Sequence, residues 1–561
     1  MELRIRNFGD LKPEFERLLN MEIKSVEEAE QWLIKRGELY AVFEEEMAWR
    51  YIKMTTHTNN KDYFIEYQKF VEEIEPKFKQ YFNKLNRKLI SLPIIEDIEK
   101  KFPTLVRSVR REIELYREEN LALFSEESKL ASEFGKITGS MSVKYGGKEL
   151  TLQQASKYLM VLNRSERREV YYLISQERMK YKDELNELLT KLIEVRSRIA
   201  LNAGFKNYRD FKHAQLERFD YTVNDVLAFH DVIAEEVVPL VDNMMKIRKN
   251  NLNLDRLKPW DLAVDITNSE PLEPFKDTQE LIHKAIACLT EVKPLYGEFL
   301  QKMHKEGLLD LESRKNKAPG GYNYPLLRSK MPFIFMNASG QLRDVVTLLH
   351  ESGHAIHAFL TADIPLTELR ETPSEVAELA SMSMELISME HWHVFFNDDK
   401  ELARAKLTHL DDVLKVLPWI ATIDRFQHLL YTEPKHSTID RYMFWAETFR
   451  KFSDSITDWS EAEWQFFNTW QKQLHIYEVP FYYIEYAFAQ LGAIAIWRNY
   501  KQNPEKTLLQ YENALKAGYT KTIPEIYELA GIKFDFSKDY VKELMHFVFN
   551  EIDDILKILN S

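Results

Sequence analysis

Long stretches of this chain repeat apolar residues three and four positions apart, and that spacing restricts the fold to packed helices. Glycine, which weakens helix interiors, accounts for only 16 of 561 residues. The stretches 26–54 and 62–90 keep the spacing throughout, and Ser25 with Glu28 forms a capping box before the first of them. Thr151 with Gln154 forms another before "ASKYLMVL". The same pattern predicts helices over 165–200, 223–250, 276–304, 400–415 and 538–559.

Strand patterns are few. The segment 142–152 predicts a hairpin that turns at Gly146-Gly147, and "KMPFIFMN" (330–337) is a short apolar run bounded by Pro332 and Asn337. The chain is therefore expected to be mostly α, with a small β-sheet. We divide it into a helical N-terminal region, 1–200, and a second region, 201–561, and expect these two halves of the chain to be interwoven.

Charge and cysteine content exclude several classes of protein. The net charge of -13 argues against a nucleic-acid partner, which favours a basic surface. Cys288 is the only cysteine, so any metal site must use histidine and carboxylate ligands. No stretch approaches the roughly 20 apolar residues that span a bilayer, and the first residues lack a signal-peptide core. We expect a cytoplasmic protein with no membrane partner.

The stretch "VVTLLHESGHAIHAF" (345–359) predicts a metal site. On a helix, His350 and His354 lie one turn apart on one face, so both imidazoles can reach one zinc ion at about 2.0–2.1 Å. Glu351 completes the pattern H-E-x-x-H, in which the carboxylate takes a proton from a water activated by zinc. His357, about 10 Å along the axis from His350, is expected to support or pack. Without a metal, these are ordinary helix-surface histidines.

Gly353 in the same helix costs roughly 1 kcal/mol relative to alanine. A close approach by another backbone, for instance the 330–337 strand, would explain it.

A catalytic zinc takes three protein ligands and keeps one position open. Leu360 stands where the metzincin class has its third histidine, so that class is excluded. Within 368–390 the candidates are Glu371, Glu375, Glu378 and Glu385. Thr372 as N-cap with Glu375 would form a capping box, and Glu371 would lie outside the helix. Glu378 is therefore our third ligand, and Glu385, seven residues on, is expected to orient a ligand.

These residues carry a family resemblance. "LLHESGHAIHAF" followed by "AELASMSMEL", with "KAPGGYNY" and "PFIFMN" before and "HIYEVPFYYIEYAFAQLGA" after, resembles the oligoendopeptidase F and thimet oligopeptidase family of zinc peptidases. The resemblance covers at least 316–493, and Ser352 departs from it where a bulkier residue is usual. It implies a multi-helical ellipsoid with a deep central channel, one zinc ion per chain on its floor, and cleavage of internal bonds in short, unstructured peptides.

The tyrosine-rich segment has two interpretations. Tyr482 and Tyr486 are four apart and would share a helix face, with His475 upstream. Aromatic residues at that spacing often fill a core. The resemblance instead implies that His475, Tyr482 and Tyr486 orient substrate and stabilise the oxyanion. The role of Tyr483 is left open. Tyr322 and Tyr324, after Gly320-Gly321, are expected on a mobile loop or an ordinary turn.

Two other functions remain open. One is a zinc exopeptidase, a carboxypeptidase or dipeptidase, which needs a cation or a backbone nest for the terminal carboxylate. The other is a non-catalytic helical scaffold that binds peptides, in which four protein ligands would close the zinc site. Monomer and homo-oligomer are equally open.

Overall fold

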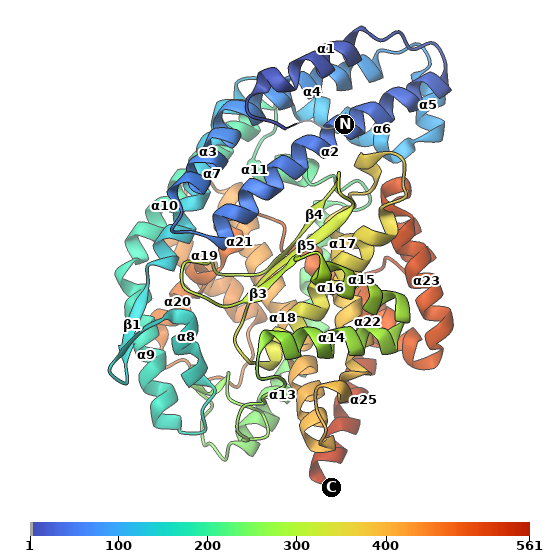
Figure 1. Ribbon diagram of the computed structural model, residues 1–561. Helices are drawn as coiled ribbons and strands as arrows, with labels where there is room; N and C mark the ends of the chain where they lie inside the picture. The colour runs from blue at the N-terminus through green and yellow to red at the C-terminus, as the bar shows by residue number, and fades with distance from the viewer. Residues whose placement is uncertain (1–3) are drawn as a thin grey trace.

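A computed structural model describes residues 4–561 (Figure 1). The first helices gather at the top of this view around one apolar core, which includes Trp32, Phe43 and Phe78. The long helix α2 crosses this layer and runs down toward the centre of the molecule. The helices are α1 Lys12–Asn20, α2 Val26–Thr56, α3 Lys61–Lys69, α4 Glu75–Ile90, α5 Ile95–Lys101 and α6 Pro103–Leu115.

A second core joins segments that are far apart in the sequence. Buried residues of 123–211 pack there against buried residues of 423–481. The first segment contains α7 Asn120–Gly139, β1 Ser142–Tyr145, β2 Lys148–Thr151, α8 Leu152–Ser156, α9 Arg164–Lys180, α10 Lys182–Asn202 and α11 Tyr208–Gln215; the second contains α19 Thr438–Phe452, α20 Glu463–Asn468 and α21 Leu474–Glu478. The division at residue 200 stays a prediction, and α10 continues across it.

The largest core surrounds the helices in the middle of the molecule. It is built on α12 Val223–Glu236, α13 Val238–Asn251, α14 Thr278–Val292, α15 Pro294–Lys305, α16 Leu342–Thr361, α17 Ser374–Met389, α18 Asp399–Thr432, α22 Ile484–Gln502, α23 Pro504–Lys516, α24 Ile523–Leu529 and α25 Lys538–Asn560. The mostly α fold is confirmed. Among the helices of residues 4–561, none is both long and apolar enough to cross a membrane.

A three-stranded sheet, in the order β3-β5-β4, lies beside α16 (Figure 1). Strand β5 (Met331–Ala338) pairs in parallel with β3 (Leu309–Glu312) and antiparallel with β4 (Tyr322–Leu326). Tyr322 and Tyr324 therefore lie on a strand, and the prediction of a mobile loop for them is wrong, because both residues pair with β5. The hairpin at Gly146-Gly147 is confirmed.

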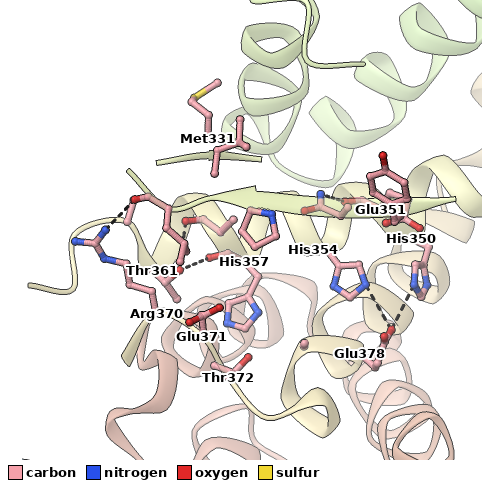
Figure 2. A pocket seen from close by; sticks show the side chains of 18 of the residues that line it. Met331, His350, Glu351, His354, His357, Thr361, Arg370, Glu371, Thr372 and Glu378 are labelled. Carbon is pink, nitrogen blue, oxygen red and sulfur yellow. Dashed lines mark hydrogen bonds and ion pairs between the residues drawn. The ribbon is translucent and has the colours of Figure 1, made fainter. Parts of the chain in front are cut away.

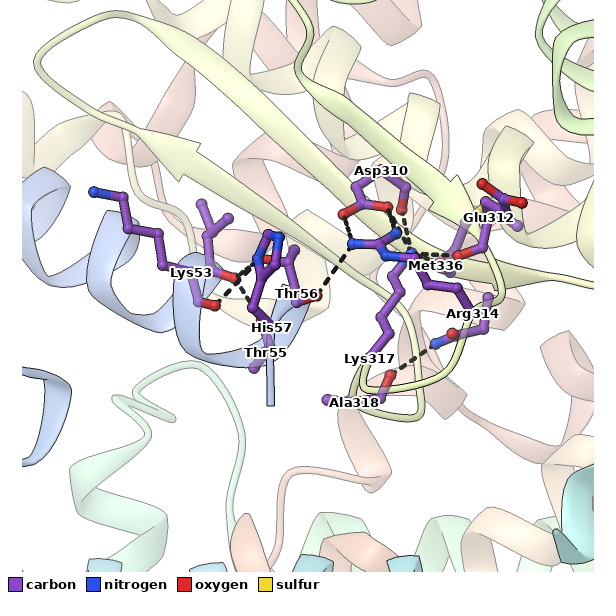
Figure 3. Close-up of polar contacts among 12 residues, drawn as sticks. Lys53, Thr55, Thr56, His57, Asp310, Glu312, Arg314, Lys317, Ala318 and Met336 are labelled. Atoms are coloured by element: carbon purple, nitrogen blue, oxygen red, sulfur yellow. Dashed lines mark hydrogen bonds and ion pairs between the residues drawn. The ribbon is translucent and has the colours of Figure 1, made fainter. Parts of the chain in front are cut away.

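Polar contacts fasten the end of α2 to the loop before β4 (Figure 3). Arg314 forms an ion pair with Asp310 and donates to the Thr56 carbonyl at 3.1 Å. The Lys317 side chain is fully buried, and its ammonium donates to the carbonyls of Asp310 and Met336 at 2.9 and 2.6 Å. These bonds satisfy a buried cation and fix the N-terminal helices against the sheet that borders the site.

Helix boundaries follow local chemistry. Thr151 and Gln154 form the predicted reciprocal cap at 3.2 and 3.0 Å. Ser25 caps Glu28 at 3.2 Å, but the Glu28 carboxylate accepts from Lys24 rather than from Ser25, so that box is only half formed. Four predicted long helices are interrupted, by the π-helix Phe70–Ile74 and at Tyr181, Val237 and Lys293. Pro239 and Pro294 begin new helices at the last two breaks, since proline cannot donate to the preceding turn.

Candidate active site

Helices α16 and α17 pack closely enough to exclude one side chain at their contact. A Cβ atom on Gly353 would lie 2.6 Å from the Ser381 Cα and 2.7 Å from the Ala380 carbonyl oxygen. The close neighbour of Gly353 is therefore α17, and the expectation of the 330–337 strand is wrong. This contact sets the spacing between the two histidines of α16 and the glutamates of α17.

The side chains of His350, His354 and Glu378 converge across that contact (Figure 2). Their ligand atoms lie within 4.8 Å of one another. The Glu378 Oε2 atom is 3.4 Å from the His350 Nε2 and 3.5 Å from the His354 Nε2. Two imidazole nitrogens and a carboxylate oxygen are the donor set of a catalytic zinc site.

Helix α17 does not begin as predicted. Its first residue is Ser374, Pro373 occupies the N-cap position, and no side chain caps the helix. The capping box of Thr372 and Glu375 is wrong, because Glu375 is buried and accepts a hydrogen bond from the Tyr221 hydroxyl at 2.6 Å. Glu378, the predicted third ligand, nevertheless faces the two histidines.

Glu385 supports His350 from behind. Its Oε1 accepts from the His350 Nδ1 at 2.6 Å, which leaves the Nε2 lone pair pointing toward Glu378 and His354. Burial lowers the pKa of His350, but the bonds to Glu378 and Glu385 raise it by more than burial lowers it. The pKa of His350 therefore lies well above its ordinary value. The site therefore stabilises positive charge, as a cation site must.

We expect Glu385→Gln to lower zinc affinity by about 10- to 100-fold, because a neutral amide no longer polarises the His350 ring. Competition with a chromophoric chelator measures this affinity. Unchanged affinity in a correctly folded variant would contradict the orienting role of Glu385.

Glu351 is the buried acid of the site. Its side chain is 6% exposed, and its Oε2 atom has no hydrogen-bond partner among residues 4–561. Burial raises the pKa of this carboxyl group. Asn323 of β4 donates to the Glu351 carbonyl at 3.1 Å and fixes this turn of α16 to the sheet. An acceptor that is free and desolvated is what a general base requires.

The tyrosines come from a turn and a helix. Helix α22 begins at Ile484, so Tyr482 precedes it, and the prediction that both tyrosines share a helix face is wrong. Their rings still meet, with centroids 5.3 Å apart, and both line the cavity. The Tyr482 hydroxyl donates to the Glu378 Oε1 at 3.0 Å. Burial raises the pKa of Tyr486 well above its ordinary value, so its hydroxyl stays protonated.

His475 lies against these rings, at 4.5 Å from Tyr483 and 6.0 Å from Tyr486 between centroids. The Trp419 indole N–H, which can only donate, bonds to the Gln473 Oε1 at 3.0 Å. The Gln473 Nε2 amino group therefore faces the His475 Nδ1, at 2.7 Å. The Nδ1 atom is then an acceptor, and the proton sits on Nε2. Burial lowers the pKa of His475 to about 4, so the ring is a neutral donor at pH 7.

The turn before Tyr482 has an unusual backbone conformation and is held by buried hydrogen bonds. No pattern in the sequence predicts either feature. Phe481 has a φ of 64°, an unusual value for an aromatic residue. Its N–H donates to the Gln427 side chain at 2.9 Å, and its carbonyl accepts from Arg218. Arg218 also pairs with Glu485 at 2.8 Å. A buried ion pair therefore fixes the turn that presents Tyr482 to Glu378.

A cavity of about 420 Å³ opens over His350, His354 and Glu378 (Figure 2). Glu351, Tyr482 and Tyr486 line it together with these three residues. His357 lines it too but lies outside the metal group, and its Nε2 has no partner among residues 4–561. The further lining residues include Tyr322, Asn323, Leu327, Lys330, Thr361, Arg370 and Glu371.

Two protein-family models and several known proteins match the sequence of this chain. The model of peptidase family M3 matches residues 158–546, and that of the peptidase M3 N-terminal domain matches 1–115. An oligoendopeptidase F homolog of Borreliella burgdorferi is 25% identical over 53% of this chain and 50% of its own length. One of Mycoplasma pneumoniae is 22% identical over 82% of this chain and 78% of its own. The match to the Borreliella relative thus spans about half of that protein.

Solved structures share the fold. PZ peptidase A with an inhibitor superposes with a TM-score of 0.93 at 27% identity and covers 99% of this chain and 98% of its own. The oligoendopeptidase-F of Enterococcus faecium, at 16% identity, has the same fold with a TM-score of 0.66 and covers 99% of this chain and 98% of its own. The resemblance to oligoendopeptidase F is confirmed, and the chain belongs to peptidase family M3.

Proposed function

We propose that this protein is a zinc-dependent endopeptidase that hydrolyses internal bonds of short, unstructured peptides. One observation carries the proposal: a free, buried glutamate lies beside a convergent His-His-Glu group in one cavity. Family membership supports peptide hydrolysis. A cytoplasmic location stays a prediction.

The metal would be held by the Nε2 atoms of His350 and His354 and by the Glu378 Oε2. This donor set fits zinc, since imidazole and carboxylate are its ordinary ligands when cysteine is absent. Zinc in this site would supply a Lewis acid that polarises the peptide carbonyl and lowers the pKa of water. Glu385 and Tyr482 each bond to one ligand, so both hold the ligand set in place.

Glu351 moves the proton. Its unpartnered Oε2 takes a proton from the attacking water and delivers it to the nitrogen of the leaving amine. The raised pKa of Glu351 brings its basicity closer to neutral pH, which favours both transfers.

The carbonyl oxygen gains negative charge during attack, and neutral donors stabilise it. His475, protonated on Nε2, lies against Tyr486 with ring centroids 6.0 Å apart; Tyr486 lines the cavity, and His475 is not among the residues that line it. Each donor of this kind contributes roughly 3–4 kcal/mol in comparable sites. Tyr482 orients Glu378 and is a positioning residue in this arrangement.

We expect peptides of about 5 to 40 residues to be cut at internal bonds, and a zinc chelator to abolish the cuts. Mass spectrometry of the digests measures the product lengths. Removal of residues from one end only would favour the exopeptidase. No cleavage by protein that contains zinc would favour the binding scaffold.

A further inference from the structure

Phe481 has a backbone conformation that few aromatic residues adopt. Its φ of 64° lies in the left-handed region, and the residue is buried. A conformation of this kind persists only where the surrounding structure enforces it, and such residues cluster at functional sites. Phe481 directly precedes Tyr482, whose hydroxyl donates to Glu378. The contacts that hold Phe481 therefore also determine where the Tyr482 side chain starts.

Two buried side chains from separate elements bond to both polar groups of the Phe481 backbone. Gln427 of α18 accepts from the Phe481 N–H at 2.9 Å. Arg218, in the segment between α11 and α12, donates to the Phe481 carbonyl. His428 packs its ring against the Phe481 ring, with centroids 5.3 Å apart. The turn is thus held by hydrogen bonds to residues 54 and 263 positions away in the sequence.

The Arg218 guanidinium holds the chain both before and after Tyr482. Besides its bond to the Phe481 carbonyl, it donates from Nε and Nη2 to the Glu485 Oε1 at 3.2 and 2.8 Å. Glu485 lies in the first turn of α22, and its N–H donates to the Tyr482 carbonyl at 3.1 Å. One planar guanidinium therefore fixes the residue before Tyr482 and the helical turn after it. A lysine ammonium, which is a single point charge, cannot reproduce this set of bonds.

Tyr482 connects this turn to the metal group. Its hydroxyl donates to the Glu378 Oε1 at 3.0 Å, while the Glu378 Oε2 faces the two histidines of α16 (Figure 2). Arg218 and Gln427 neither belong to the metal group nor line the cavity. An effect of either residue on the metal site must therefore act through the turn that they hold.

We propose that Arg218 and Gln427 are positioning residues of the metal site and that they act on it through Tyr482. The inference rests on the proposed function, in which Glu378 is the third zinc ligand. The two residues fix the backbone around Tyr482, so that its hydroxyl stays where it donates to Glu378. Loss of a partner that orients a metal ligand lowers metal affinity by about 10- to 100-fold. Zinc affinity is therefore the property that reports on these two distant residues.

The experiment measures the zinc affinity of the full chain, by competition with a chromophoric chelator, for Arg218→Lys, Tyr482→Phe and the double variant. Arg218→Lys keeps the buried charge but loses the planar fork that bonds to the Phe481 carbonyl and to Glu485. We expect each single change to lower zinc affinity by about 10- to 100-fold, and the double variant to bind zinc no more weakly than Tyr482→Phe. Losses that add in the double variant, or an unchanged affinity in folded Arg218→Lys, overturn the inference.

Arg248→Lys is the matched control. Arg248 is also buried, and it also bonds to one carboxylate, that of Asp411 at 2.8 Å, and to one carbonyl, that of Val264. None of these three residues lines the cavity. This variant should lose stability in a denaturation experiment and keep its zinc affinity. An equal loss of affinity in Arg248→Lys would assign the effect to general destabilisation and overturn the inference.

Gln427→Met repeats the test without altering a charge, and it decides the question if Arg218→Lys does not fold. Methionine has a similar volume but lacks the amide oxygen that accepts from the Phe481 N–H. Its zinc affinity should fall in the wild-type background and should not fall further in the Tyr482→Phe background. Zinc-loaded wild type that cuts no peptide overturns the proposed function, whereas the affinities of the variants still decide the inference.

Discussion

Glu351→Gln is expected to bind zinc as tightly as the wild type and to cleave peptides about 10³- to 10⁴-fold more slowly. The two side chains have nearly the same shape, so a 6% exposed position keeps its packing. The amide cannot take a proton from water, and Glu351 is outside the ligand group. Metal content and kcat on one internally cut peptide measure the two effects.

The control for this change is Glu401→Gln. Glu401 is exposed on α18 and does not line the cavity, so its variant should match the wild type in both measurements. Loss of zinc from Glu351→Gln would show that Glu351 supports the metal site rather than proton transfer. Activity near that of the wild type would contradict its role as base.

The helices were predictable because their causes are local. Apolar spacing and capping residues lie within a few positions of the element that they define, as at Thr151 and Gln154. The errors occurred where local signals compete. Pro239 and Pro294 restart helices that the apolar spacing joined, whereas Pro418 is tolerated inside α18, which continues to Thr432. Tertiary packing decides whether a helix continues at such positions, and the spacing of apolar residues carries no information about that packing.

The site divides in the same way. His350, Glu351 and His354 are fixed by one helix, so their spacing alone predicted a shared face. The capping box that distinguishes Glu375 from Glu378 in the sequence does not form. Glu375 instead accepts a hydrogen bond from Tyr221, which is 154 residues away in the sequence. The chain from Trp419 through Gln473 to His475 depends on contacts between separate helices. No local pattern in the sequence identifies it.

Gly353→Ala is expected to destabilise the protein by about 2 kcal/mol and to weaken zinc binding at least ten-fold. The added Cβ would lie 2.6 Å from a backbone atom of α17, so one helix must move away. The helical preference of alanine recovers only about 1 kcal/mol. Since Gly353 lies between the two histidines of α16 and opposite Ser381, the displacement separates His354 from Glu378.

Gly135→Ala separates the packing effect from helix propensity. Gly135 is inside α7, and its Cβ would meet only the Glu478 Oε1, at 4.0 Å. This control should gain up to about 1 kcal/mol of stability and leave zinc affinity unchanged. Denaturation of the metal-free proteins and zinc titration measure the two quantities independently. If Gly353→Ala kept both values, α17 would be able to retreat without moving Glu378, and the close contact would not set the geometry of the metal site.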